Sequence, residues 1–182
     1  MAGPVPSALG PTAMAFKSGI MLKSGRMLDA DLIVTATGLN VIPLGGIELR
    51  VEGTPVRLAG TLSYKGAMFN GIPNLASVIG YTNASWTLKC ELVCRLVCRL
   101  LNYMEKQGHE SCVPHNDDAS VRAEPLLNLT SGYLRRVSDQ LPKQGSKRPW
   151  QLRKNYLLDR LWLGRGALDD GVMRFSGRRA RA

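Results

Sequence analysis

Residues 80–104 read GYTNASWTLKCELVCRLVCRLLNYM, a polar turn led by glycine that runs into the longest helical pattern in the chain. The apolar residues of this pattern recur at steps of three and four: Leu92, Val93, Leu96, Val97, Leu100, Leu101 and Met104. Such spacing is typical of an amphipathic helix with one buried face. The sequence therefore predicts a long, mostly buried helix from about Trp86 to Glu105, around which the rest of the chain packs.

The segment ahead of this helix has the features of a strand that leads into a helix start. The short apolar run Ala76–Ile79 predicts a covered strand. Asn83 and Ser85 are residue types that accept hydrogen bonds from the unpaired first amides of a helix. The positive end of a helix suits an anionic or electron-rich ligand group, although most capped helix starts bind only water. Both interpretations stay open from this feature alone.

Elsewhere the patterns predict short strands and one further helix. The run Leu32–Ala36 is apolar and β-branched, which is typical of a strand covered on both faces in a parallel sheet. Residues 20–28 and 47–58 each carry two strand-like runs around a glycine-containing turn, so each predicts a hairpin. Pro149 opens an apolar and basic pattern that predicts a helix to about Leu163.

Composition describes a globular protein with a basic end. The chain has 182 residues, of which 45% are apolar and 21% charged. The net charge is +10, and from Lys143 onward eleven Lys and Arg face three acids. A positive net charge makes nucleic acid or an anionic membrane a candidate partner. We favour a surface helix docked on the core with its charges solvated, which makes nucleic acid a disfavoured partner and leaves peripheral anionic membrane contact open.

The cysteines and histidines do not form a metal signature. Cys90, Cys94 and Cys98 lie four residues apart on the predicted helix, and there is no CxxC. Core packing is the expected role of these thiols, which fits a reducing cytoplasm. His109 and His115 lie in a polar stretch that predicts a surface loop without metal ligands at suitable spacing. No secretory signal or membrane-spanning pattern is evident, so a cytoplasmic location is expected.

Four blocks together resemble one protein family. They are LDADLIVTATGLN (28–40), YKGAMFNGIPNLASVIGYTNASWTLK (64–89), VCRLLNYM (97–104) and LPKQGSKRPWQLRKNYLLD (141–159). In order and spacing they resemble the C-terminal part of flavin-dependent Baeyer-Villiger monooxygenases, nearest to the type that activates thioamide prodrugs such as ethionamide. The resemblance runs from about Ser18 to Arg179, nearly the whole chain.

The resemblance implies a chemistry and a set of neighbours for the cofactor. In such enzymes NADPH reduces FAD, and a peroxyflavin then oxygenates a ketone or a sulfur compound. Carried over on this match, the flavin or active-site neighbours are Thr82, Asn83, Ala84, Ser85, Trp86 and Thr87, with Gly38 where the nicotinamide domain returns to the FAD domain. Amides at the helix start would stabilise the electron density that reduction places on the N1 and O2 side of the flavin. No catalytic or metal-binding residue is assigned.

The departures from the family pattern are large. No GxGxxG motif occurs in the chain, so the glycine turns that let backbone amides approach a pyrophosphate are not encoded. The family fingerprint FxGxxxHxxxW is missing as well, because Val113 and Ala119 stand where a tryptophan would follow each histidine. The arginine that the family pairs with the peroxyflavin belongs upstream of the Ala36–Gly38 element. The chain thus resembles the last third of an enzyme, and by itself it is expected to bind neither FAD nor NADPH and to be inactive.

The expected fold class is α/β, the C-terminal portion of a Rossmann-like flavoprotein with two dinucleotide-binding domains, with an incomplete sheet, one long buried helix and a C-terminal helix. The expected organisation is an irregular leader (1–17), the end of the FAD-binding domain with its linker (18–107) and a basic extension (108–182). Two alternatives stay open. One is a non-enzymatic basic module that binds nucleic acid or an anionic membrane, and the other is one chain of a split monooxygenase.

Overall fold

The computed structural model describes residues 14–35, 41–127 and 137–177 of the 182-residue chain. The chain divides into two compact units, Met1–Leu39 and Asn40–Ala182, which are taken in turn. Gly38, one of the residues assigned to the cofactor, lies outside the described residues. The division falls inside the segment 18–107, and unit 2 holds both the turn and the long helix.

Unit 1 contains a small antiparallel meander. Strands β1 (Met14–Phe16), β2 (Gly19–Met21) and β3 (Met27–Asp29) pair in chain order, which confirms the hairpin predicted for residues 20–28. The strand predicted at Leu32–Ala36 is wrong over residues 32–35, and Ala36 lies outside the described residues. Leu32 is 81% exposed and Val34 is 79% exposed. No described strand pairs with this run, so it lacks the neighbours that a covered strand requires.

Unit 2 begins with a short 3-10 helix, η1 (Pro43–Gly46), and two hairpins. β4 (Leu49–Val51) pairs with β5 (Thr54–Val56), which confirms the hairpin predicted within residues 47–58. Its turn residues Glu52 and Gly53 both have positive φ, the conformation of a tight type I′ turn. β6 (Ser63–Tyr64) and β7 (Met68–Phe69) form the second hairpin.

The other strands of unit 2 pair over long sequence separations. β8 (Ser111–Pro114) pairs antiparallel with β11 (Met173–Ser176), and β9 (Ala123–Pro125) pairs antiparallel with β10 (Lys143–Gly145). The strand predicted at Ala76–Ile79 is wrong, because Ala76 makes only an isolated bridge to Met68. The sheets of the described residues are thus small and antiparallel, in an α/β chain. The Rossmann-like architecture stays a prediction.

Helix α1 (Trp86–Gln107) is the long helix that the apolar spacing predicted. It ends at Gly108, whose φ of 72° is left-handed and whose amide bonds to the carbonyls of Glu105 and Met104. Its buried face contains Lys89, Leu92, Val93, Leu96, Leu100 and Met104. The predicted buried face is thus confirmed for Leu92, Val93, Leu96, Leu100 and Met104, and it also contains the charged Lys89. It is wrong for Leu101, which is 59% exposed.

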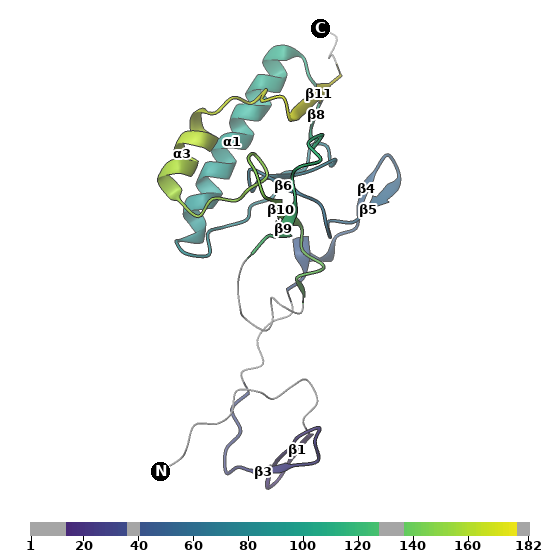
Figure 1. Cartoon of the computed structure of the whole chain (residues 1–182), viewed down its shortest axis with the longest axis vertical. Helices are drawn as coiled ribbons and strands as arrows, with labels where there is room; N and C mark the ends of the chain where they lie inside the picture. The colour runs from purple at the N-terminus through teal and green to yellow at the C-terminus, as the bar shows by residue number, and fades with distance from the viewer. Residues whose placement is uncertain (1–13, 36–40, 128–136, 178–182) are drawn as a thin grey trace. The chain divides into compact units, whose positions relative to one another are not determined.

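Helix α3 (Tyr156–Arg165) lies beside α1 in Figure 1 and begins later than predicted. The predicted start at Pro149 is wrong, since Pro149 and Trp150 lie in a turn. The Leu152 amide donates to the Gln144 side chain, a partner outside any helix. Asn155 caps the true start, because its side chain accepts a hydrogen bond from the Leu158 amide.

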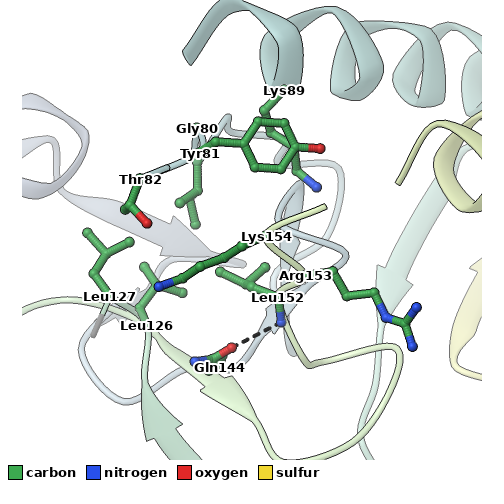
Figure 2. A pocket seen from close by; sticks show the side chains of 11 residues that line it. Gly80, Tyr81, Thr82, Lys89, Leu126, Leu127, Gln144, Leu152, Arg153 and Lys154 are labelled. Carbon is green, nitrogen blue, oxygen red and sulfur yellow. Dashed lines mark hydrogen bonds between the residues drawn. The ribbon is translucent and has the colours of Figure 1, made fainter. Parts of the chain in front are cut away.

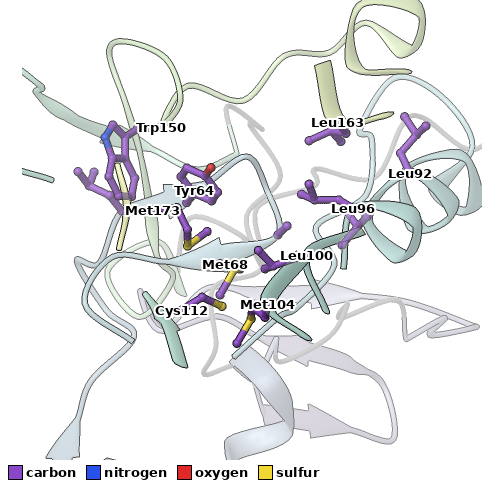
Figure 3. Packing of buried hydrophobic residues seen from close by; sticks show 13 residues of the cluster. Tyr64, Met68, Leu92, Leu96, Leu100, Met104, Cys112, Trp150, Leu163 and Met173 are labelled. Carbon is purple, nitrogen blue, oxygen red and sulfur yellow. The ribbon is translucent and has the colours of Figure 1, made fainter. Parts of the chain in front are cut away.

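The core of unit 2 lies between α1, α3 and the β6–β7 hairpin (Figure 3). Trp150 is 1% exposed and meets the Tyr64 ring edge-on at a centroid distance of 5.7 Å. The guanidinium of Arg99 on α1 donates to the carbonyls of Leu163 at 2.6 Å and Gly166 at 2.8 Å at the end of α3. Aliphatic packing and one bidentate arginine thus hold the two helices together.

The thiols differ from the prediction of core packing. Cys112 is buried, but Cys94 and Cys98 are exposed and Cys90 is half-buried, and all four are free. The polar stretch around His109 and His115, predicted as a surface loop, contains β8 and so is partly a strand. Among the described residues there is no group of three His, Cys, Asp or Glu residues that could hold a metal ion. In the same residues no helix is long and apolar enough to cross a membrane.

Candidate functional site

The predicted cofactor neighbours form an exposed turn that leads into α1. The Trp86 ring lies against the backbone of Gly80, so closely that a Cβ on Gly80 would sit 2.0 Å from a ring atom. Trp86 is nevertheless 51% exposed, so it does not pack under a sheet as a core residue. Only glycine permits this contact at position 80, and the contact fixes where the ring points.

The start of α1 lacks the side-chain caps that the sequence predicted. Ser85 is the N-cap residue, but no described side chain accepts from the first amides of the helix, so the predicted capping by Asn83 and Ser85 is wrong. The Ser85 hydroxyl lies 2.7 Å from the Thr87 hydroxyl instead. The Asn83 side chain donates to the Lys154 carbonyl at 3.1 Å and so ties the turn to the segment before α3. The first amides of α1 are left without a side-chain acceptor in the part of the chain that the structure describes.

Behind the turn lies a buried cluster of three polar residues, Tyr81, Lys89 and Asp159. The same Asp159 oxygen, Oδ2, accepts from the Tyr81 hydroxyl at 2.7 Å and from Lys89 Nζ at 2.6 Å. The side chain of Lys89 is 4% exposed and that of Asp159 is fully buried. Burial, and then the hydrogen bond to the carboxylate, raise the pKa of Tyr81, so its hydroxyl stays protonated. The cluster joins the turn, α1 and α3 at one carboxylate.

A small pocket opens beside this cluster (Figure 2). Thr82, Lys89 and Lys154 contribute polar groups to its lining, and its apolar lining comes from Ile79, Leu126, Leu127 and Leu152. Neither Arg153 nor Lys154 forms an ion pair with another described residue. The pocket is therefore cationic and apolar together.

The size of the pocket limits what it can take. Its volume is about 30 Å³, which is room for a water molecule or a similarly small polar group. A three-ring flavin cannot fit there. The exposed start of α1 fits one edge of such a ring better, because its N-cap makes no side-chain hydrogen bond and Trp86 is half-exposed. The residues present thus fit the edge of a flavin, whereas no glycine-rich turn for a pyrophosphate is encoded in the chain.

A second cluster, formed by Tyr64, Lys65 and Asp170, repeats the same three residue types. Asp170 Oδ2 accepts from the Tyr64 hydroxyl at 2.7 Å and from Lys65 Nζ at 2.8 Å. Burial alone would raise the pKa of Asp170, but the hydrogen bonds from Lys65 and Tyr64 outweigh it and hold that pKa below its usual range. Burial lowers the pKa of Lys65 despite the neighbouring carboxylate. This cluster anchors the segment that leads into β11.

The structure keeps most of the sequence-assigned residues in one place. Thr82 lines the pocket, Asn83 reaches Lys154, and Ser85 contacts Thr87, while Ala84 and Trp86 are exposed on the same turn. These contacts place the residues but do not test their assignment to a cofactor.

Sequence reasoning missed the Tyr81, Lys89 and Asp159 cluster. A signal for it existed, because Lys89 shares the helical face of Leu92 and Leu96, and a lysine within a buried stripe needs a buried acid as its partner. Asp159 is the only acid in α3. That acid on an otherwise basic helix is the natural partner for Lys89.

Comparison with known proteins identifies relatives. The chain is 49% identical over 163 residues to the FAD-containing monooxygenase EthA of Mycobacterium tuberculosis, a match that covers 90% of this chain and 33% of that protein. It is 43% identical over 164 residues to EthA of Mycolicibacterium smegmatis, with 90% and 33% covered. It is 45% identical over 160 residues to AlmA of Acinetobacter baylyi, whose description names FAD binding, with 87% and 32% covered.

Other comparisons give no match. No family model matches the chain, and no solved structure matches it. The chain spans about a third of the length of the curated relatives it matches. Identity at this level over about nine-tenths of the chain shows common descent. The chain therefore belongs to the family of FAD-containing monooxygenases, of which it represents about a third of the length.

Proposed function

We propose that the chain is the C-terminal portion of an NADPH-dependent flavin monooxygenase that oxygenates ketones or sulfur compounds, and that its turn at residues 81–87 lies at the pyrimidine edge of the flavin. The observation that carries the proposal is the uncapped, exposed start of α1 within a chain of this family. When bound, the flavin would supply the redox and oxygen-transfer chemistry. The chain would supply a helix end that favours negative charge on the adjacent ring edge.

The contacts of the turn support a positioning role. Asn83 donates to the Lys154 carbonyl, and Tyr81 donates to Asp159, so two hydrogen bonds fix the turn against the α3 segment. A turn that is held in place presents its amides in one orientation, which lowers the reorganisation needed when charge develops nearby. The half-exposed Trp86 face is an apolar surface that would exclude water on one side of the ring.

The chain by itself is proposed to hold neither FAD nor NADPH tightly. Both dinucleotides need backbone amides around the pyrophosphate, and the sequence encodes no GxGxxG turn to provide them. In this proposal the remaining domains come from sequence that corresponds to the other two-thirds of the relatives. We keep a cytoplasmic location as part of this proposal, supported by four free cysteines.

A chimera tests the proposal. The corresponding third of M. tuberculosis EthA is replaced by this chain, and retention of FAD on gel filtration and the rate of flavin reduction by NADPH are measured. The chimera is expected to retain FAD, whereas the isolated chain elutes without yellow colour. Asn83→Leu and Ser85→Val are each expected to slow flavin reduction about tenfold, with the melting temperature changed by only a few degrees.

The control is Asn102→Leu, a change of the same kind on the exposed side of α1. It is expected to leave the rate of flavin reduction unchanged. Parental rates in both turn variants would refute the assignment of the turn to the flavin edge. In a further arm the isolated chain is mixed with EthA that lacks its own corresponding third. Recovery of FAD binding in that mixture would favour the split-enzyme alternative over a single polypeptide.

A further inference from the structure

Helix α3 is apolar on two sides, and only one of them is covered. Leu163 is fully buried against the core and Trp162 is half-buried. On the opposite side Leu157 is 67% exposed and Leu161 is 57% exposed. These two leucines are one helical turn apart, so they lie next to each other on the outward face. A helix with apolar residues on both sides is typical of one that is covered on both sides.

Basic side chains flank this leucine pair. Arg160 and Arg165 are both exposed on α3, Arg160 three residues after Leu157 and Arg165 four residues after Leu161, so each lies about one turn from a leucine. The outward face of α3 thus carries two leucines flanked by two arginines.

Acids are missing from this face for a structural reason. From Lys143 to Arg165 the sequence holds seven Lys and Arg and a single acid, Asp159. That acid is fully buried, where it pairs with Lys89 of α1. The fold therefore removes the one negative charge of the segment from the surface and leaves an outward face without charge compensation of its own. Such a face is complementary to an extended anionic surface, whereas a protein partner would need acids placed opposite each cation.

We propose that the outward face of α3 (Leu157, Leu161, Arg160 and Arg165) rests on an anionic lipid surface. The leucines enter the boundary between headgroups and acyl chains, and the long basic side chains reach the lipid phosphates beside them. Each cation near such a surface adds to the attraction, and the leucines add an apolar contribution that salt does not screen. The contact is peripheral and needs no bound flavin, so it stands apart from the proposed oxygenation.

Vesicle sedimentation tests this surface with the full 182-residue chain. The partition of the protein is measured onto vesicles of phosphatidylcholine with phosphatidylglycerol and onto vesicles of phosphatidylcholine alone. Binding is expected to be at least about tenfold stronger on the anionic vesicles and to weaken with salt. Arg160→Gln with Arg165→Gln is expected to weaken anionic binding about tenfold. Leu157→Asn with Leu161→Asn is expected to weaken it by a similar factor at every salt concentration.

Matched controls separate the face from charge and apolarity in general. Arg57→Gln with Lys106→Gln removes two other exposed cations, and Leu101→Asn removes an exposed leucine on α1. These variants are expected to bind like the parent, including any contribution from the basic C-terminal residues that all the proteins share. Circular dichroism checks that each variant is folded. All variants are expected to be folded, because the changed side chains are exposed.

Three results would overturn the proposal. The first is equal binding of the parent to both kinds of vesicle. The second is a loss of binding in the controls that matches the loss in the α3 variants. The third is a dimer, detected by analytical ultracentrifugation, that Leu157→Asn with Leu161→Asn dissociates while vesicle binding is unchanged, which would make the face a contact between two copies of the chain.

Discussion

At the scale of single residues, the site depends on one buried carboxylate. Asp159 accepts a hydrogen bond from each of two other elements, from Tyr81 in the turn and from Lys89 in α1. Its second oxygen, Oδ1, is buried without a partner among the described residues. A buried charge pair of this kind contributes little net stability when intact, but the loss of one member leaves an uncompensated charge. The cluster is therefore more important for fixing the turn than for stability itself.

Lys89→Met tests this reasoning. Removal of the ammonium leaves the Asp159 carboxylate buried without its counter-charge, so the free energy of unfolding is expected to fall by about 3 kcal/mol. The double variant Lys89→Met with Asp159→Leu removes both charges and is expected to recover part of that loss. Urea denaturation of the two variants beside the parent measures the difference. A double variant less stable than Lys89→Met would show that the cluster acts through something other than charge pairing.

The second cluster predicts a dependence of stability on pH. The pKa of Asp170 is lower in the folded chain than in the unfolded chain, where the pKa of an aspartate is about 4. The stability that its ionised form contributes is therefore complete above about pH 4 and is lost as the pH falls through the folded-state pKa. Asp170→Asn is expected to destabilise the chain clearly at neutral pH and much less at about pH 3.

Denaturant unfolding of Asp170→Asn at the two pH values checks this sign. Asp169→Asn, a change of the same chemistry at an exposed neighbour, is the control and is expected to have little effect at either pH. An Asp170→Asn penalty that stays equal at both pH values would show that the carboxylate contributes by packing rather than by charge.

At the scale of elements, the contact between α1 and α3 depends on Arg99. Its guanidinium donates to two carbonyls near the C-terminal end of α3, at Leu163 and Gly166. Lysine offers a point charge in place of a planar fork and cannot hold both carbonyls in this geometry. These bonds also fix the far end of the helix whose outward face we assign to lipid. α3 is thus held at its start by Asn155 and at its end by α1.

Arg99→Lys is expected to lower the free energy of unfolding by about 1.5 kcal/mol and to speed hydrogen exchange in the last turn of α3. Arg95→Lys is the matched control, because Arg95 is exposed and pairs only with Glu91 on its own helix among the described residues. That change is expected to cost less than about 0.5 kcal/mol. Equal effects of the two substitutions would argue against the capping role of Arg99.

The elements also show what the sequence could and could not predict. α1 was predictable because seven apolar positions repeat at helical spacing within 22 residues, and a pattern of that length is a strong helix signal. Strands such as β6 and β7 have two residues each, too few for any alternation to appear. Trp150 was expected to belong to the second helix, but it lies in a turn before α3 and packs edge-on against Tyr64. Short elements and side-chain direction are set by tertiary contacts that periodicity does not contain.

At the scale of the whole molecule, one part of the candidate site could be predicted from the sequence and another part could not. The location of the turn at residues 81–87 was predictable, since it follows from where the long helix starts. The cluster behind it was not, because Lys89 and Asp159 are 70 residues apart in sequence and meet only when α1 and α3 pack. The run at Leu32 and Val34 shows the converse case. Its composition is that of a covered strand, and it is exposed in a chain that spans about a third of its relatives.

The contact between Trp86 and Gly80 makes the turn observable by fluorescence. The chain has three tryptophans, of which Trp150 is 1% exposed, Trp162 is half-buried and Trp86 is 51% exposed. A soluble quencher such as acrylamide will therefore reach Trp86 first, and the quenched fraction of the emission will come mainly from the turn. A flavin placed at the same edge would quench that indole by energy transfer. The protein thus carries an intrinsic optical reporter at the turn that we assign to the flavin edge.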